Sequence, residues 1–171
     1  MIEREKIEQI SIRGRVAFAI LCLELAIKHF KLETLNRKFL LGLLWSYTNS
    51  NVGRWHEVLS ECIPNSVLVD DFVKEEMELL TEDQFNELRE LFNSSNDVIN
   101  QIINQIFWIA TEDLYSSISN YSQGTIDTLL KILKEMDKYE IDTPDIQLFT
   151  ELTIEENDGW GREFKREDVM G

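Results

Sequence analysis

The chain has 171 residues, of which 43% are hydrophobic and 29% charged, with only 7 glycines and 2 prolines. This composition excludes a disordered or collagen-like chain and predicts one globular domain over residues 1–171, rich in long helices. Asp and Glu total 32 against 17 Lys and Arg, and the resulting net charge of −15 argues against nucleic acid or an anionic membrane as partner and favours a basic protein.

Apolar spacing predicts helices from the start of the chain. The first is expected over residues 3–30 with a bend at Gly14, and its two apolar sides indicate a central position. A second helix is expected over 35–47 with Phe39 on its buried stripe, and a short one around Trp55 ends before Pro64. Residues 66–80 are predicted to form a helix that buries its apolar side chains, which are Val69, Phe72, Val73, Met77 and Leu80.

The second half of the chain continues the helical pattern. Thr81 and Gln84 have the spacing of a capping box, so a helix is expected from there to residues 93–96. Long helices are predicted over 97–119 and from 124 to beyond Met136, followed by a short turn that Thr143 and Pro144 open. Residues 152–154 are expected to be briefly extended, and 155–171 to form a tail. The predicted fold class is therefore all-α, an irregular bundle of about seven helices with a short C-terminal tail.

Motifs of catalysis and metal binding are missing from the sequence. His29 and His56 lie in neither the HExxH nor the ExxH spacing, and the GxxxxGK[ST], GxGxxG, GxSxG, CxxC and EF-hand patterns do not occur. The sequence thus predicts no enzyme, no cofactor and no metal site. One alternative stays open, an unrecognised enzyme that uses Glu24 and a histidine.

Glu24 is a carboxylate inside the most apolar helix, where burial costs free energy unless the charge is paired. Lys28, four residues on, is the expected partner, with Arg13 and Arg15 as further candidates. The two cysteines are predicted to be buried free thiols of a reducing compartment. Since neither a signal peptide nor a membrane-spanning stretch is expected, the protein is predicted to be cytoplasmic.

The negative charge is unevenly distributed. Residues 1–40 have a net charge of +3, and residues 41–171 have a net charge of −18. From Glu57 to Asp97 the sequence has 12 acidic residues and only 2 basic ones. This pattern predicts a broad negative surface, which either keeps the protein in solution or docks a basic protein. The candidate partner-binding residues on it are Asp70, Asp71, Glu75, Glu76, Glu78, Glu82, Asp83 and Glu87.

Two aromatic residues near the end of the chain, Trp160 and Phe164, are the other candidates for partner binding. They lie in a stretch punctuated by two glycines, Gly159 and Gly161. Such side chains either pack back on their own domain or anchor an interface, where aromatic residues dominate the binding energy.

Four segments share a layout with a known family: RGRVAFAILCLE over residues 13–24, LLGLLWSYTNSNVGRWHEV over 40–58, FWIATEDLY over 107–115 and GWGREF over 159–164. In this layout the chain resembles the all-α immunity proteins of bacterial polymorphic-toxin and contact-dependent growth inhibition systems. The resemblance implies a cytoplasmic protein that binds and blocks a cognate toxin domain, often a nuclease. A nuclease grips phosphates with a basic cleft, which an acidic surface can occupy. A helical scaffold or regulatory subunit that self-associates stays the alternative.

Overall fold

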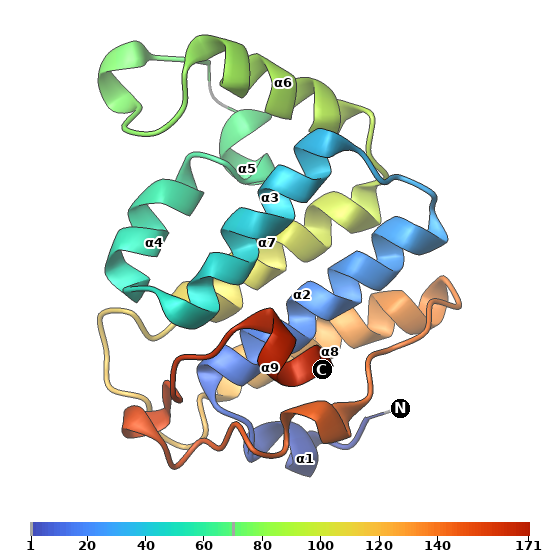
Figure 1. The fold of residues 1–171 in the computed structure, drawn as a ribbon, viewed down its shortest axis with the longest axis vertical. Helices are drawn as coiled ribbons and strands as arrows, with labels where there is room; N and C mark the ends of the chain where they lie inside the picture. Colours follow the sequence, from blue (N-terminus) through green and yellow to red (C-terminus); the bar gives the residue numbers. More distant parts are fainter. Residues whose placement is uncertain (1, 70) are drawn as a thin grey trace.

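The computed structural model describes residues 2–69 and 71–171, apart from the side chain of Leu35. Over these residues the chain is an all-α bundle without strands, so the predicted fold class is confirmed (Figure 1). The helices are α1 (Arg4–Glu8), α2 (Ile12–His29), α3 (Leu35–Trp45), α4 (Val52–Ser60), α5 (Pro64–Val67), α6 (Glu82–Asn93), α7 (Asp97–Thr111), α8 (Gln123–Lys138) and α9 (Arg166–Met170). Four 3-10 turns connect them: η1 (Ser46–Asn49), η2 (Lys74–Glu76), η3 (Ile146–Phe149) and η4 (Asn157–Gly159).

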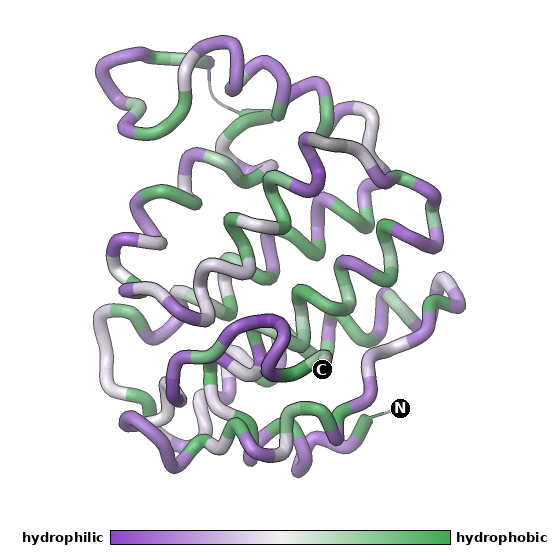
Figure 2. The backbone as a smooth tube through the Cα atoms, in the orientation of Figure 1, coloured by the Kyte–Doolittle hydropathy of each residue, from purple (hydrophilic) through white to green (hydrophobic). Residues whose placement is uncertain are grey.

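Helix α2 is the centre of the bundle. Fourteen of its 18 residues are buried, because α7 and α8 pack along it and α3 and η1 contact it elsewhere. Figure 2 shows the hydrophobic residues of α2 in the middle of the molecule. A helix that is apolar on more than one side needs cover on each of those sides, and the predicted central position is confirmed. None of the helices in the described part of the chain has the length and apolarity needed to cross a bilayer.

The expected first helix is divided in two at residues 9–11, three residues before Gly14. Ser11 caps α2 by accepting a hydrogen bond from the Gly14 amide at 3.2 Å, and its own amide donates to the Leu152 carbonyl at 2.7 Å. Ile10 and Thr153 form an isolated antiparallel bridge, so the extended stretch expected at residues 152–154 is confirmed. Gly14 allows a close approach rather than a bend, since a Cβ there would lie 2.5 Å from Ile10 Cγ2.

Residues 155–171 are not a tail, and this prediction is wrong. Phe164 and Val169 are buried, and α9 packs beside η3 across the lower part of the bundle (Figure 1). The Phe164 amide donates to the Thr48 carbonyl at 3.1 Å, and the Thr48 hydroxyl donates back to the Phe164 carbonyl at 2.7 Å. These contacts are with residues more than 100 positions away, which local periodicity does not report.

The guanidinium of Arg15 connects three parts of the chain from inside the protein. It is fully buried, and it donates to the carbonyls of Ile7 at 3.2 Å, Glu8 at 3.1 Å and Tyr121 at 2.6 Å. It also donates to the Thr125 hydroxyl at 2.7 Å. Burial lowers the pKa of Arg15 to about 10, which leaves the side chain charged at neutral pH. The Arg15 side chain thereby connects α2, on which it lies, to α1 and to the start of α8.

Replacing Arg15 by Met should destabilise the fold by about 3 kcal/mol or more, because several buried carbonyls would lose their donor. Urea unfolding followed by circular dichroism measures the loss. Lys6→Met is the matched control, since Lys6 is exposed and its loss should change the free energy of unfolding by no more than about 0.5 kcal/mol. Equal stability of the two variants would contradict the role given to Arg15.

Candidate interaction surface

The predicted acidic residues gather at one end of the molecule. All seven that the structure describes are exposed: Asp71, Glu75, Glu76, Glu78, Glu82, Asp83 and Glu87. Asp70 lies outside the described residues. The seven belong to the connection between α5 and α6 and to the first half of α6, at the top of Figure 1. Residues 68–87, without Asp70, are called the acidic segment below.

The helix predicted over residues 66–80 is wrong. Helix α5 ends at Val67, and the described residues between it and α6 form a loop that contains the three-residue turn η2. Helix stability in proteins comes mostly from packing an apolar face, and Val69 and Val73 have no element to pack on, being 76% and 39% exposed. Both are β-branched, which lowers helix propensity further.

The buried carboxylate of Glu61, which directly follows α4, fixes the end of this loop next to α6. Glu61, only 9% exposed, accepts hydrogen bonds from the backbone amides of Glu78 at 2.6 Å, Leu79 at 3.0 Å and Leu80 at 3.1 Å. Charge-assisted bonds of this kind are roughly twice as strong as neutral ones. At the near end, Arg89 Nε donates to the Val67 carbonyl at 2.9 Å. The loop is therefore tied down at both ends although it is not helical.

The acidic segment is also apolar on its surface, which the sequence did not reveal. Leu68 is 37% exposed and Leu79 40%, in addition to Val69 and Val73. Figure 2 shows hydrophilic and hydrophobic stretches alternating around this end of the chain. Exposed apolar groups rimmed by charges are typical of protein interaction sites.

A small hollow extends this surface onto α3. It has a volume of about 120 Å³ and is lined by Asn36, Phe39, Leu80, Gln84, Glu87 and Leu88. Phe39 is 49% exposed, so its predicted burial is wrong. A volume this small is below that of ordinary ligand pockets, and it suits one inserted side chain.

Burial of basic side chains makes the surface more negative than the composition indicates. Arg13, Arg15 and Arg37 are buried, whereas Glu61 is the one buried carboxylate in the described part of the chain. The chain's net charge of −15 therefore corresponds to −17 over all the other charged side chains. Arg13 donates to the carbonyls of Tyr47 and Ser50, so its charge is used inside the protein.

The two aromatic candidates near the end of the chain have different positions. Phe164 is 6% exposed and packs on its own domain, so it cannot contact a partner in this conformation. Trp160 is half-buried, and its carbonyl accepts a hydrogen bond from the Arg13 amide at 3.0 Å. Neither residue lies at the acidic segment, which is at the top of Figure 1, whereas residues 155–171 run across the lower half of the molecule.

Glu24 pairs with the C-terminal region and not with Lys28, Arg13 or Arg15. Its two oxygens accept from Arg166 Nε at 3.2 Å and Arg166 Nη2 at 2.9 Å, and Trp45 Nε1 donates to it at 2.6 Å. The expected i,i+4 pair is thus wrong. The hydrogen bonds to Glu24 raise the pKa of the Arg166 guanidinium. This forked pair holds α9 against α2.

Removing the charge of Glu24 by Glu24→Gln should loosen α9. The Arg166 side chain is 41% exposed, so the expected loss of stability is only about 1 kcal/mol. Trypsin should cleave after Lys165 and Arg166 faster than in the parent protein, as mass spectrometry of a digestion series would show. Glu151→Gln, an equal change of charge at an exposed position away from both cleavage sites, should digest at the parent rate. Equal rates for both variants would contradict the pairing.

The histidines do not join Glu24 in a common site. His29 is exposed at the end of α2 with its ring edge-to-face against Phe30. His56 on α4 stacks on Phe107 of α7 with ring centroids 5.5 Å apart. Within residues 2–69 and 71–171, no three His, Cys, Asp or Glu side chains are grouped so that they could hold a metal ion.

Both cysteines are buried free thiols, as predicted. Burial raises the pKa of Cys22, and burial together with the charge of Glu61 raises the pKa of Cys62 to about 12. The thiolate is the reactive form of cysteine, so both side chains are protected near neutral pH.

The thiols should react with Ellman's reagent at about pH 8 only after unfolding in urea. Because an unfolded cysteine has a pKa of about 8.5, the unfolded chain releases thiol protons above that pH while the folded chain keeps them. The free energy of unfolding should therefore fall as pH rises beyond about 8.5. A Cys22→Ala/Cys62→Ala variant should lose this part of the pH dependence. Rapid labelling of the folded protein would show that the thiols are not protected.

No known family model matches this chain, and no curated protein or solved structure was found to be similar to it. The resemblance to immunity proteins has no independent support from these comparisons.

Proposed function

We propose that the protein is an inhibitory binding protein that docks a basic partner on the acidic segment, in the manner of an immunity protein blocking a toxin nuclease domain. One observation supports the proposal. Seven exposed carboxylates and four exposed aliphatic side chains lie on one short segment of chain, and Glu61 holds the backbone of this segment by hydrogen bonds.

The two kinds of side chain would contribute differently. The carboxylates raise the association rate with a basic partner and select it over acidic ones. Individual exposed ion pairs add little affinity, typically about 0–1 kcal/mol each. Burying a valine such as Val69 is worth about 1.5–3 kcal/mol, so the aliphatic side chains would supply more of the affinity. A surface serving only to repel other molecules has no need of exposed valines and leucines.

The loop conformation supports docking rather than mere solvation. A segment already held at Glu61 and Arg89 loses less conformational freedom when it binds, and this preorganisation favours affinity. The negative field also argues against nucleic acid as the partner, since phosphates would be repelled.

Charge reversal on the acidic segment tests the proposal. The partner is first isolated from the native cell by pull-down with the full chain and then purified, and the triple variant is Asp71→Lys/Glu75→Lys/Glu78→Lys. Association measured by surface plasmon resonance at low salt should slow by about ten-fold or more, because long-range attraction is lost. Val69→Ser should instead raise the dissociation rate and leave association nearly unchanged.

The matched control is Asp137→Lys/Glu151→Lys/Glu155→Lys, which changes the net charge by the same amount at exposed positions elsewhere. If both triple variants slow association equally, net charge and not the acidic segment is responsible. Unchanged rates for the Asp71 variant would refute the proposed surface. Sedimentation of the free protein separates the self-association alternative, which requires a concentration-dependent mass.

A further inference from the structure

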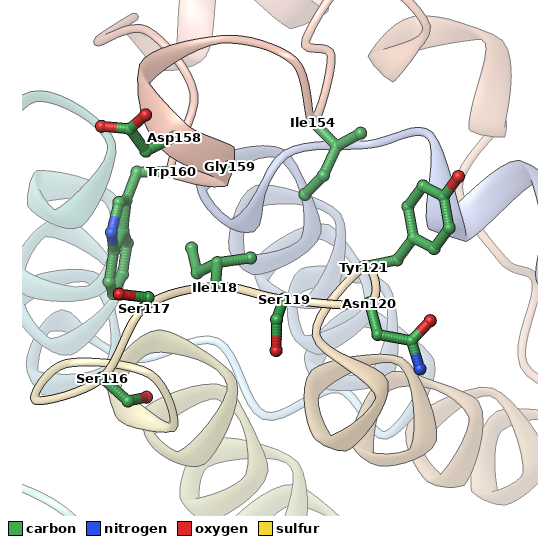
Figure 3. A pocket seen from close by; sticks show the side chains of 10 residues that line it. All are labelled: Ser116, Ser117, Ile118, Ser119, Asn120, Tyr121, Ile154, Asp158, Gly159 and Trp160. Atoms are coloured by element: carbon green, nitrogen blue, oxygen red, sulfur yellow. The ribbon is translucent and has the colours of Figure 1, made fainter.

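A second surface feature lies at the other end of the molecule. Two loops line an open hollow of about 600 Å³, within the size range of small-molecule sites (Figure 3). One loop is residues 116–121, between α7 and α8, and the other contributes Ile154 and residues 158–160. Trp160 stands on one side of the hollow and Tyr121 on the other, with Ile118 between them.

Unusual backbone conformations are concentrated on these two loops. Seven non-glycine residues in the described part of the chain have a positive φ, and five of them lie here: Asn120, Tyr121, Ser122, Asn157 and Asp158. Such residues cost of order 1–3 kcal/mol each and persist only where the surroundings hold them. Arg15 does so by donating to the Tyr121 carbonyl, and Asp113 by accepting from the Ser122 hydroxyl.

Close packing fixes the two loops against each other. Gly159 has a φ of +95°, and a Cβ there would lie 2.8 Å from Ile118 Cγ2. Any side chain at this position would push the loops apart. The shape of the hollow therefore depends on a glycine and on a left-handed run of residues, both of which are features of the backbone itself.

The lining has the chemistry of a neutral polar ligand. The hydroxyls of Ser117 and Ser119 and the amide of Asn120 make no hydrogen bond to other described residues, and so they are available to a ligand. Among the residues that the structure describes, no cationic side chain lines the hollow and Asp158 is the only charged one, which disfavours phosphates and carboxylates. Trp160 and Tyr121 offer aromatic surface, of which the indole is half-buried and the Tyr121 side chain 45% exposed.

We propose that this hollow is a binding site for a neutral saccharide of one or two rings. The face of a pyranose carries C–H groups of slight positive charge, which suit the negative face of an aromatic ring such as Trp160. Its hydroxyls both donate and accept hydrogen bonds, as do the serine hydroxyls and the Asn120 amide. The site is independent of the function proposed above.

A cationic ligand fits the hollow less well. An aromatic cage requires rings within about 6 Å of one charge, whereas Trp160 and Tyr121 stand on opposite sides of Ile118 (Figure 3). Asp158 alone would then have to hold the cation, and it is an exposed side chain. A saccharide can span the distance because it is contacted at several points.

Titration of the full chain with maltose, cellobiose and diacetylchitobiose tests the proposal, using saturation-transfer difference NMR. At least one disaccharide should bind with a Kd of about 10 mM or less. Trp160→Leu and Tyr121→Ser should each weaken this binding by about ten-fold or more, through loss of an aromatic contact. Tyr115→Ser is the matched control, because Tyr115 is 89% exposed on the same connection and does not line the hollow; its binding should equal the parent's.

Tetramethylammonium and inorganic phosphate serve as comparison probes in the same experiment. Saccharide binding that Tyr121→Ser and Trp160→Leu leave unchanged would place the site elsewhere and overturn the proposal. The proposal would also be overturned if a comparison probe bound while none of the disaccharides did. Absence of binding of every disaccharide up to about 20 mM would overturn it as well. Circular dichroism of each variant verifies that it is folded. If Trp160→Leu does not fold, the effect of Tyr121→Ser on saccharide binding alone tests the site.

Discussion

The buried guanidinium of Arg15 is the interaction on which the arrangement of this protein depends. A charge in the interior is tolerated only when hydrogen bonds replace its water, and Arg15 obtains them from α1, from the loop before α8 and from α8 itself. The Ile7 carbonyl also accepts from the Ile10 amide at 3.1 Å, and Arg15 adds the long-range connection to the carbonyls of Glu8 and Tyr121. The same side chain therefore closes the lower end of the bundle and holds Tyr121 in the left-handed conformation that shapes the hollow.

The other buried arginines extend this use of positive charge. Arg13 satisfies the carbonyls that end η1, and Arg37 donates to the Ser95 hydroxyl at 2.7 Å. The excess positive charge of residues 1–40 is therefore located on side chains inside the protein. The surface therefore has a more negative net charge than the whole chain. Its expected attraction for a basic partner follows in part from the burial of arginines in the core.

Sequence patterns identified elements that are stabilised locally or by all-round burial. The position of α2 and the capping box of Thr81 and Gln84 follow from local patterns and are confirmed. The bridge at Thr153, which is made with Ile10, does not follow from neighbouring residues. Periodicity cannot tell whether an apolar face meets another element. It therefore predicted one helix over residues 66–80, where Val69 is on the surface, and continued another from 97 to 119 although α7 ends at Thr111.

Predicting the candidate sites was limited by the same missing information about distance in space. The acidic residues stand out because charge is visible in the sequence, but periodicity assigns Val69 and Val73 among them to the core and gives Leu68 and Leu79 no role. Glu24 was noticed as an unusual carboxylate, yet its partner Arg166 is 142 residues away. The hollow combines two loops whose only local signals, Asn, Asp and Gly, are common to ordinary turns.

The two surfaces are separated by the rigid part of the bundle. The acidic segment lies at one end of the long axis and the hollow near the other, with α2, α3 and α7 between them (Figure 1). The chain connects them through α7, which runs from the end of α6 to the loop at residues 116–121, but dense interior packing resists small displacements along such a helix. Coupling between two such sites would need an element with two discrete arrangements.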